Sequence, residues 1–287
     1  MWLVRLYWLS GYPSFSAFQH SLGFQSRFLK SQQIFGNNLL KTASLPVAKN
    51  NTQSLLLRHS TMATWLISLP SLVKSNEEEF GRLMSTHSHM NEQLMFNFDA
   101  SWQSCPVCRD EDLCLFGSSY WHVSHQLPSI THCRFHGKRL EVALEPVKNL
   151  YHEQLPHYVE AWCKPEREEC ESIDAWERFV LKVHDQCIND PLYGFMLREN
   201  VEQSIGIVGK NTAQRRRECE VLTPEFETAL GDSLLRHLFR SHAKLGKLAK
   251  VNILNTLFAS QNQSKGVRNP VFWLAIAYWL RHKIGVL

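Results

Sequence analysis

The chain has 287 residues, 44% of them hydrophobic, with nine Trp and sixteen Phe, so it can bury a sizeable core and hold two or three small modules. Arg5 interrupts the apolar residues at the start and no small-residue cleavage site follows, which excludes a secretory signal. The apolar run from Val271 to Leu280 has about half the length of a membrane span. We therefore expect a soluble cytoplasmic protein with no membrane partner.

The charge is distributed unevenly, although the formal net charge is only +4. Residues 210–287 contain thirteen Lys and Arg against five Asp and Glu, a net charge of +8, whereas residues 1–209 contain 18 against 22, a net charge of −4. A cationic last quarter is expected of a protein that binds the phosphate backbone of nucleic acid, although a solvated helix face has the same composition. We expect double-stranded DNA as a partner.

The first forty residues predict two helices joined by a turn. Met1 to Leu9 is mostly apolar, Ser10 to Pro13 is a turn signal, and Ser14 can cap a second helix that stops before Gly23. This is the outline of a helix-turn-helix, and also of any helical hairpin. Two more helices are expected over residues 55–69 and 77–87.

The next segment contains a Cys-x2-Cys pair followed by a Cys-x2-His pair: Cys105, Cys108, Cys133 and His136. Gaps of two residues let a tight turn direct both side chains of a pair onto one ion. Thiolate and imidazole donors favour zinc, and four protein ligands leave no position for a water or a substrate. We predict a structural zinc site. The alternative is four unrelated residues, such as ordinary buried thiols.

Three further donors lie close to these four in the sequence and could replace one of them: Cys114, His125 and His132. His136 is preferred because it alone forms a two-spaced pair with Cys133, and because Gly137 follows it where the turn needs a relaxed backbone. His125 and His132 are expected at the surface or beside the ligands. A zinc-dependent nuclease or hydrolase remains the catalytic alternative, and it requires one of the four ligands to be absent from the metal.

The remaining thiols have no paired spacing, and five free cysteines suit a reducing compartment: Cys114, Cys163, Cys170, Cys187 and Cys219. Residues 206–211 do not form a phosphate loop, because their glycines are too close together and Asn211 stands where a Ser or Thr must reach magnesium. No other catalytic motif is present. We expect a protein that is not an enzyme and has no catalytic residues.

The second half of the chain predicts further helices. Ser172 can cap one with an apolar face, Thr223-Pro224-Glu225 is a start signal for another, Gly231 interrupts that helix, and Asn269-Pro270 opens the last. The triplet of arginines before Thr223 is expected in a loop or arm. We expect DNA contacts from these cations: Arg215, Arg216, Arg217, Arg236, Arg240, Lys244, Lys247 and Lys250.

These elements predict a mainly α fold in which helix-turn-helix modules flank a small structural zinc-finger segment of the Cys3His type. We expect a helical domain over residues 1–95, a zinc-binding segment over 96–145, a helical connector over 146–210 and a basic helical DNA-binding region over 211–287.

The zinc segment resembles one family closely, the TniQ/TnsD transposition proteins. The resemblance is carried by the Cys105-Pro106-x-Cys108 pair and the Cys133-x2-His136-Gly137 pair, by two segments between them, Tyr120-Trp121-His122 and His125-Gln126-Leu127-Pro128, and by Leu140 after them. The opening residues Arg5-Leu6 and Leu9 to Ser14 are similar to the family's N-terminal helix-turn-helix. Weaker similarity from Leu234-Leu235-Arg236 to the last helix points to the TnsD branch.

The resemblance implies a selector of transposon insertion sites. Such a protein recognises attachment-site DNA, recruits the AAA+ regulator TnsC and so directs the transposase, with zinc as its cofactor and no chemistry of its own. The alternative within the family is a TniQ adaptor that links a CRISPR effector complex (Cascade) to TnsC for RNA-guided transposition. Either protein would be bacterial and cytoplasmic, and associated with the nucleoid when bound to DNA.

Three departures from the family pattern bear on these expectations. The chain begins inside what resembles the first family helix, so we expect its start to be incomplete. Ser129 stands where a glycine usually follows the Leu-Pro pair, and no second cysteine-rich finger follows the first. The missing finger and the basic last quarter favour the TnsD branch, whereas the short length favours the adaptor.

Overall fold

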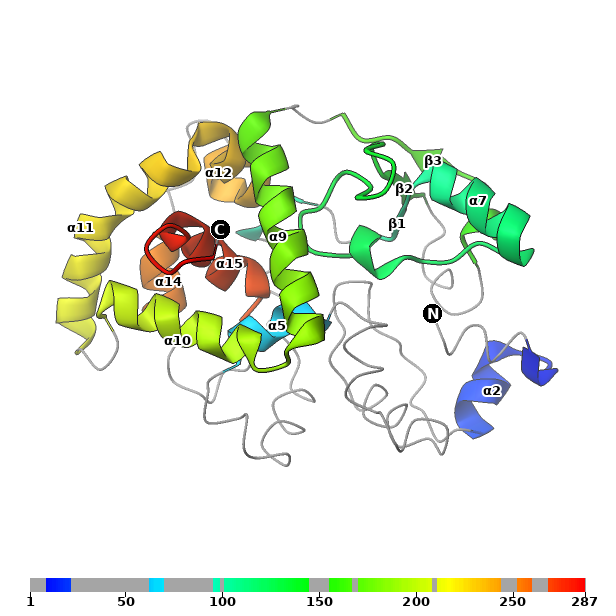
Figure 1. The fold of residues 1–287 in the computed structure, drawn as a ribbon, viewed down its shortest axis with the longest axis horizontal. Coiled ribbons are helices and arrows are strands. Elements are labelled where there is room, and N and C mark those ends of the chain that lie inside the picture. The colour runs from blue at the N-terminus through cyan, green and yellow to red at the C-terminus, as the bar shows by residue number, and fades with distance from the viewer. Residues whose placement is uncertain are drawn as a thin grey trace. The chain divides into compact units, whose positions relative to one another are not determined.

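Two units, each assembled from separate stretches of the chain, make up the fold (Figure 1). The computed structural model describes residues 9–21, 62–69, 95–98, 101–144, 155–166, 170–207, 211–243, 252–259 and 268–286. Unit 1 comprises residues 1–62 and 100–167, and unit 2 comprises residues 63–99 and 168–287. Their described parts are mainly helical, which confirms the expected fold class. Within them, no helix combines the length and the apolar character needed to cross a membrane.

The N-terminal turn and its cap form as the sequence predicts. Residues 9 and 10 are helical, Gly11 has a φ of 71°, and α2 spans Phe15–Ser21. The Ser14 hydroxyl oxygen accepts a hydrogen bond from the Ala17 amide at 3.1 Å, as expected of an N-cap. The rest of the first expected helix lies outside the described residues, as do the helix expected over residues 77–87 and residues 55–61. The N-terminal helix-turn-helix therefore stays a prediction.

In unit 1, the segment predicted to bind zinc over residues 96–145 combines one helix with a small antiparallel sheet, whose last strand lies in the residues that follow, up to 166. From here on we call residues 101–166 the zinc segment. Helix α7 spans Pro106–Phe116 and ends at Gly117, whose φ of 69° suits a glycine. The sheet has the order β1-β2-β3, and two short 3-10 helices, η4 and η5, complete the segment. The bounds of these shorter elements are β1 Gln103–Ser104, η4 Val123–His125, β2 Glu141–Ala143, η5 Pro156–Tyr158 and β3 Trp162–Cys163.

An aromatic cluster forms the core beside this sheet. Trp121 lies with its ring 5.0 Å from that of Trp102 and 5.9 Å from that of Trp162, and it packs with Ala143 and Val159. The guanidinium of Arg109 lies 4.1 Å from the ring centre of Trp162, a cation–π contact. The core thus joins α7 to the strands that precede and follow the metal-binding residues.

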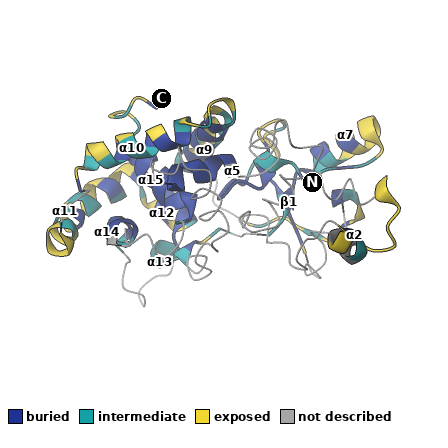
Figure 2. Ribbon diagram, turned by 90° about the horizontal axis from the view of Figure 1, so that it is seen from below, coloured by how far each residue is buried: buried dark blue, intermediate teal, exposed yellow. Residues whose placement is uncertain are grey.

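Unit 2 is a helical assembly around one buried helix, α15, which spans Pro270–Leu280. Every residue of α15 is buried, and Figure 2 shows the helix in dark blue. A helix that is apolar on all sides requires neighbours on all sides, and Figure 1 shows α15 among the longer helices of this unit. The other bounds are α5 Met62–Trp65, η1 Leu66–Ser68, α9 Glu171–Asn189, α10 Tyr193–Ile205, α11 Thr212–Leu230, α12 Asp232–Leu238, α13 Arg240–Ala243 and α14 Ile253–Ala259.

Several local start and stop signals act as expected in unit 2. The Asn269 side chain accepts a hydrogen bond from the Val271 amide at 3.0 Å, so Asn269-Pro270 does open α15. Gly231 separates α11 from α12. Helix α9 begins at Glu171 after Cys170, so Ser172 lies inside its first turn rather than at its cap. The apolar face predicted for α9 is buried as expected: Ile173, Trp176, Phe179, Val180 and Val183.

The start predicted for α11 at Thr223 is wrong. The helix begins eleven residues earlier, at Thr212, because the Asn211 side chain caps it by accepting a hydrogen bond from the Gln214 amide at 3.0 Å. Pro224 lies inside the helix, where a proline removes one backbone hydrogen bond. The Thr223 hydroxyl donates to the Cys219 carbonyl oxygen at 2.5 Å and accepts from Asn252 at 2.9 Å. These side-chain bonds connect the turn of α11 that contains Pro224 to Asn252, which immediately precedes α14.

Helix α10 approaches η1 very closely, and a glycine permits it. A Cβ atom added to Gly194 would lie 2.6 Å from the Leu66 Cβ and 3.0 Å from the Ile67 backbone nitrogen. One turn later, the Arg198 guanidinium donates to the Ser68 carbonyl oxygen at 2.7 Å, and it lies 4.2 Å from the ring centre of Trp273 in α15. Glu202 balances its charge at 2.9 Å. The glycine and the arginine together hold three elements in contact.

We predict that Gly194→Ala destabilises unit 2. Alanine favours a helix over glycine by about 1 kcal/mol, but overpacking against the Leu66 side chain and the η1 backbone costs about 3 kcal/mol, so the free energy of unfolding should fall by about 2 kcal/mol. Urea unfolding measures this. The control is Gln203→Ala on the exposed face of the same helix, which should change stability by less than about 0.5 kcal/mol. Equal midpoints for the two variants would contradict the close approach.

Candidate metal centre

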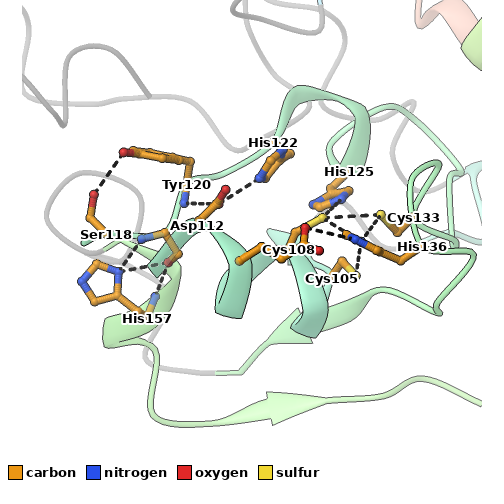
Figure 3. Close-up of polar contacts among 12 residues, drawn as sticks. Cys105, Cys108, Asp112, Ser118, Tyr120, His122, His125, Cys133, His136 and His157 are labelled. Carbon is orange, nitrogen blue, oxygen red and sulfur yellow. Dashed lines mark hydrogen bonds and ion pairs between the residues drawn. The ribbon is translucent and has the colours of Figure 1, made fainter. Parts of the chain in front are cut away.

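Four side chains from two separate turns converge in unit 1 (Figure 3). The sulfur atoms of Cys105, Cys108 and Cys133 and a ring nitrogen of His136 all lie within 4.8 Å of one another. The His136 Nδ1 lies 3.7, 3.3 and 3.6 Å from these three sulfurs in the same order, and the sulfurs of Cys108 and Cys133 are 3.6 Å apart. The four residues predicted as ligands are thus brought together, and none of the thiols is in a disulfide.

The spacing of the donors fits a tetrahedral metal ion. Zinc bond lengths of ~2.3 Å to sulfur and ~2.0 Å to nitrogen place tetrahedral ligands roughly 3.8 Å apart between sulfurs and roughly 3.6 Å apart between sulfur and nitrogen. The separations of 3.3 to 3.7 Å between His136 Nδ1 and the three sulfurs, and between the sulfurs of Cys108 and Cys133, lie close to these values. The cluster can therefore hold one ion with four protein ligands.

Backbone geometry positions each pair of ligands. Cys105 is the N-cap of α7 and Cys108 lies in its first turn, so the positive end of the helix dipole favours both thiolates. The second pair lies in a tight hairpin turn, where the Gly137 amide donates to the Cys133 carbonyl at 2.9 Å and the Cys133 amide donates to the Lys138 carbonyl at 2.8 Å. Gly137 has a φ of 60°, which explains the glycine after the histidine.

Glu111 orients the imidazole of His136. Its carboxylate oxygen lies 3.1 Å from Nε2, on the side of the ring opposite the sulfurs. An Nε2–H that donates to Glu111 leaves the lone pair of Nδ1 directed at the cluster, which is the usual outer contact of a metal-bound histidine. Sequence reasoning missed Glu111, because an acidic residue on an exposed helix face has no distinctive pattern.

Burial sets the protonation of the three thiols. It raises the pKa of Cys105 and of Cys108 above the ordinary thiol value, and the neighbouring sulfurs add to the effect. Burial also opposes ionisation of Cys133, but the amides of His136 and Phe135 and the side chains of Cys108 and His136 together lower its pKa. Cys133 is thus the thiol that ionises most readily, whereas an ion must displace protons from the other two.

His125 is fully buried beside the cluster, so of the two positions expected for it the structure selects the one next to the ligands. Its Nε2 lies 3.8 Å from the Cys108 sulfur, within reach of a hydrogen bond to sulfur. Burial, helped by the positive charges of His122, His136 and Arg109, lowers the pKa of His125 to about 3. The ring is therefore neutral near pH 7 and can donate one N–H to the Cys108 thiolate. His132 lies in the hairpin, partly buried, with its Nδ1 3.0 Å from the Thr131 hydroxyl.

A buried carboxylate fastens the following loop to α7. Asp112 accepts hydrogen bonds from the Tyr120 amide at 3.0 Å and from His122 Nε2 at 2.9 Å (Figure 3). The ring of His122 in turn lies 4.9 Å from that of His125. A chain of contacts therefore runs from Asp112 through two imidazoles to the Cys108 sulfur, and it explains why the Tyr-Trp-His segment lies against the metal-binding residues.

Ser129 occupies a strained position. It has a φ of 65°, a conformation that side chains other than glycine rarely adopt, and the residue is buried. Its hydroxyl donates to the Pro128 carbonyl at 2.5 Å. The position where the resembling family usually has glycine is thus one where the backbone favours glycine, and here local hydrogen bonding offsets part of the strain.

The basic residues predicted to contact DNA are placed only in part. Arg215, Arg216 and Arg217 lie in the first half of α11 rather than in a preceding loop, because Asn211 starts the helix before them. Arg216 pairs with Glu220 at 3.0 Å, and Arg215 is half-buried. Arg217 and Arg236 are exposed on α11 and α12, and Arg240 is half-buried at the start of α13. The predicted contacts Lys244, Lys247 and Lys250 lie outside the described residues.

A scan against protein-family models found no match to this chain, and a search of curated proteins found none either.

We predict that Cys108→Ser abolishes metal binding and unfolds the zinc segment, since metal binding of this kind contributes folding free energy. Elemental analysis of the purified protein measures the metal, and amide hydrogen exchange over residues 101–166 measures the fold. Cys114→Ser is the matched control, because Cys114 is exposed on the same helix and lies outside the cluster. A Cys108→Ser protein that kept its metal and its protected amides would contradict the assignment.

We predict a weaker effect for the neighbouring imidazole. His125→Phe fills similar space but removes the N–H donor to Cys108, so the affinity for metal should fall about 10- to 100-fold. His125→Gln retains an N–H donor and should recover part of the loss. Competition with a chromophoric zinc chelator measures both variants. If Phe and Gln bound metal equally well, packing rather than the hydrogen bond would explain the buried ring.

Proposed function

We propose that the four-donor cluster holds one structural zinc ion. Three thiolates and an imidazole at tetrahedral spacing are donors that suit zinc. Four protein ligands leave no open position for a water molecule, whereas catalytic zinc usually has three protein ligands and a water. This supports a protein that uses its metal to hold α7 and the hairpin together and that is not an enzyme. Bound zinc with a water in its coordination shell would instead support the nuclease or hydrolase alternative.

On this basis we propose that the protein is a transposon target-site selector that binds attachment-site DNA and recruits the AAA+ regulator TnsC. The observation that carries the proposal is the closed Cys3His cluster, because its four donors, and His125 against Cys108, are residues of the segment that resembles the TniQ/TnsD signature. A selector needs a rigid scaffold and no reaction of its own. A closed metal site agrees with that requirement.

The helical unit supports a DNA-binding role through its exposed cations. Arg217 and Arg236 are exposed on two helices that are joined through Gly231, and the surrounding sequence carries most of the excess positive charge. Cations on the exposed faces of helices can neutralise phosphates, while base-edge contacts from a helix in the major groove would supply the specificity.

One observation favours the second candidate, an adaptor that docks on a CRISPR effector complex and contacts DNA little. Arg216 is paired with Glu220, and Arg215 and Arg240 are half-buried, so the described surface is less cationic than the composition suggests. Co-purification with effector subunits in the absence of target DNA would support the adaptor over direct recognition.

We predict a site-specific and salt-dependent affinity for duplex DNA. A selected duplex, obtained by binding selection from a randomised library, should bind more tightly than its scrambled version at physiological salt. Arg217→Ala and Arg236→Ala should each weaken binding and lower the slope of log affinity against log salt by about 1, since each removes about one phosphate contact.

Arg178→Ala is the matched control, because Arg178 is exposed on α9 outside the basic quarter. Fluorescence anisotropy over a range of salt concentrations measures all three variants. Equal affinities for selected and scrambled duplexes would exclude direct recognition. An unchanged salt slope in both arginine variants would exclude these residues as contacts.

A further inference from the structure

The hairpin turn that carries two metal ligands also exposes an aromatic ring. We call residues 134–138 the knuckle tip. Phe135 lies between Cys133 and His136 and is 64% exposed, although phenylalanine usually lies in a core. The ring meets the edge of the His122 ring, with the ring centres 6.5 Å apart, but it belongs neither to the donor cluster nor to the aromatic core around Trp121. This single edge contact leaves most of the Phe135 ring exposed.

The knuckle tip is held in a fixed shape. Backbone hydrogen bonds close the turn from Gly137 to Cys133 at 2.9 Å and from Cys133 to Lys138 at 2.8 Å, and the Leu140 amide donates to Thr131 at 2.8 Å. The ligands on both sides of Phe135 are fixed by the cluster. An aromatic ring presented on a rigid turn loses little conformational freedom when it binds.

The sequence around the ring is cationic, since residues 121–140 include Arg134, Lys138 and Arg139 and contain no Asp or Glu. One carboxylate from α7, that of Glu111, lies against the neighbouring His136. The guanidinium of Arg134 lies 5.6 Å from the Phe135 ring centre, and Lys138 is exposed two residues after His136. Arg139 is tied to the Pro165 carbonyl at 3.3 Å. An exposed aromatic ring therefore lies beside one exposed cation, Arg134, and three residues before another, Lys138.

An exposed ring between cations matches the chemistry of a nucleic-acid strand better than that of a protein surface. Successive nucleotides present a flat base between negatively charged phosphates, and proteins bind them with aromatic side chains in a positively charged setting. Protein interfaces also use aromatic and arginine side chains, but they are depleted in lysine, whereas Lys138 is exposed three residues after this ring. Helix α7 does have exposed apolar side chains, Leu115 and Phe116. They lie at its C-terminal end, about 12 Å along the helix from Cys108 in its first turn.

We propose that the knuckle tip binds an unpaired DNA base, with Phe135 stacked on the base and Arg134 and Lys138 on the adjacent phosphates. The inference rests on the proposed function in that its ligand is DNA, and it names a form of DNA that the helical arginines do not require. A strand with an unstacked base, as in a distorted duplex, can reach this site, whereas intact paired bases have no free face for the ring.

The test compares three DNA ligands by fluorescence anisotropy with the zinc-loaded protein: an intact duplex, the same duplex with a central unpaired bulge, and a thymidine strand. Phe135→Ala and Phe135→Leu should each weaken binding of the bulged duplex and the strand about tenfold, without changing the affinity for intact duplex. Phe135→Trp should bind at least as tightly as the natural residue. Phe116→Ala is the matched control, since Phe116 is 60% exposed in the same unit, and it should change nothing.

Three results would overturn the inference. Phe135→Ala could bind the bulged duplex as tightly as the natural protein, Phe135→Leu could bind like the natural residue, or the alanine variant could lose intact and bulged duplex equally. Zinc content is measured for every variant. If Phe135→Ala loses both zinc and DNA binding, it has misfolded, and Phe135→Leu, which keeps an apolar side chain on the same turn, then decides the question.

The same measurements separate this inference from the proposed function. If Phe135→Ala still prefers the selected duplex over the scrambled one, and the bulge does not change the affinity of the natural protein, the stacking site is excluded but the selector is not. If the protein binds unpaired strands through Phe135 but shows no preference for a selected duplex, the selector is excluded and the stacking site is supported.

Discussion

The convergence of three sulfurs and one imidazole is the constraint on which the zinc segment depends. The strands of this segment are only two or three residues long, and its helix has exposed apolar residues at one end. Such short elements bury too little apolar surface to hold a fold by themselves. Three buried thiols and one partly buried imidazole converge in this segment, and one ion could hold all four together. One ion bound by these donors would therefore stabilise both the order of the segment and its shape.

The metal-binding residues were predictable because their signal is local. A two-residue gap fixes which side chains can share an ion, and Gly137 marks the turn that makes the second pair possible. Asn269, Ser14 and Gly231 are similar cases, since a cap or a break depends on a few neighbouring residues. The helical class of the fold follows from many such signals taken together.

Other features could not be predicted because long-range packing decides them. Thr223-Pro224-Glu225 has the composition of a helix start, yet α11 continues through it because its neighbours in unit 2 hold it there and the Thr223 hydroxyl bonds the helix backbone. His125 and Gly194 have no sequence pattern that distinguishes a buried role from an exposed one. Their roles emerge only when Cys108 and Leu66, distant in sequence, lie against them.

The complete burial of α15 has a consequence for the order of folding. Unit 2 collects residues from as early as position 63, but the helix at its centre is residues 270–280. During synthesis, α9, α10 and α11 therefore emerge with their apolar faces uncovered and must wait for the last of these residues. The residues of the zinc segment are all synthesised much earlier. If metal ions are supplied during translation, this segment can therefore fold on the nascent chain before unit 2 is complete.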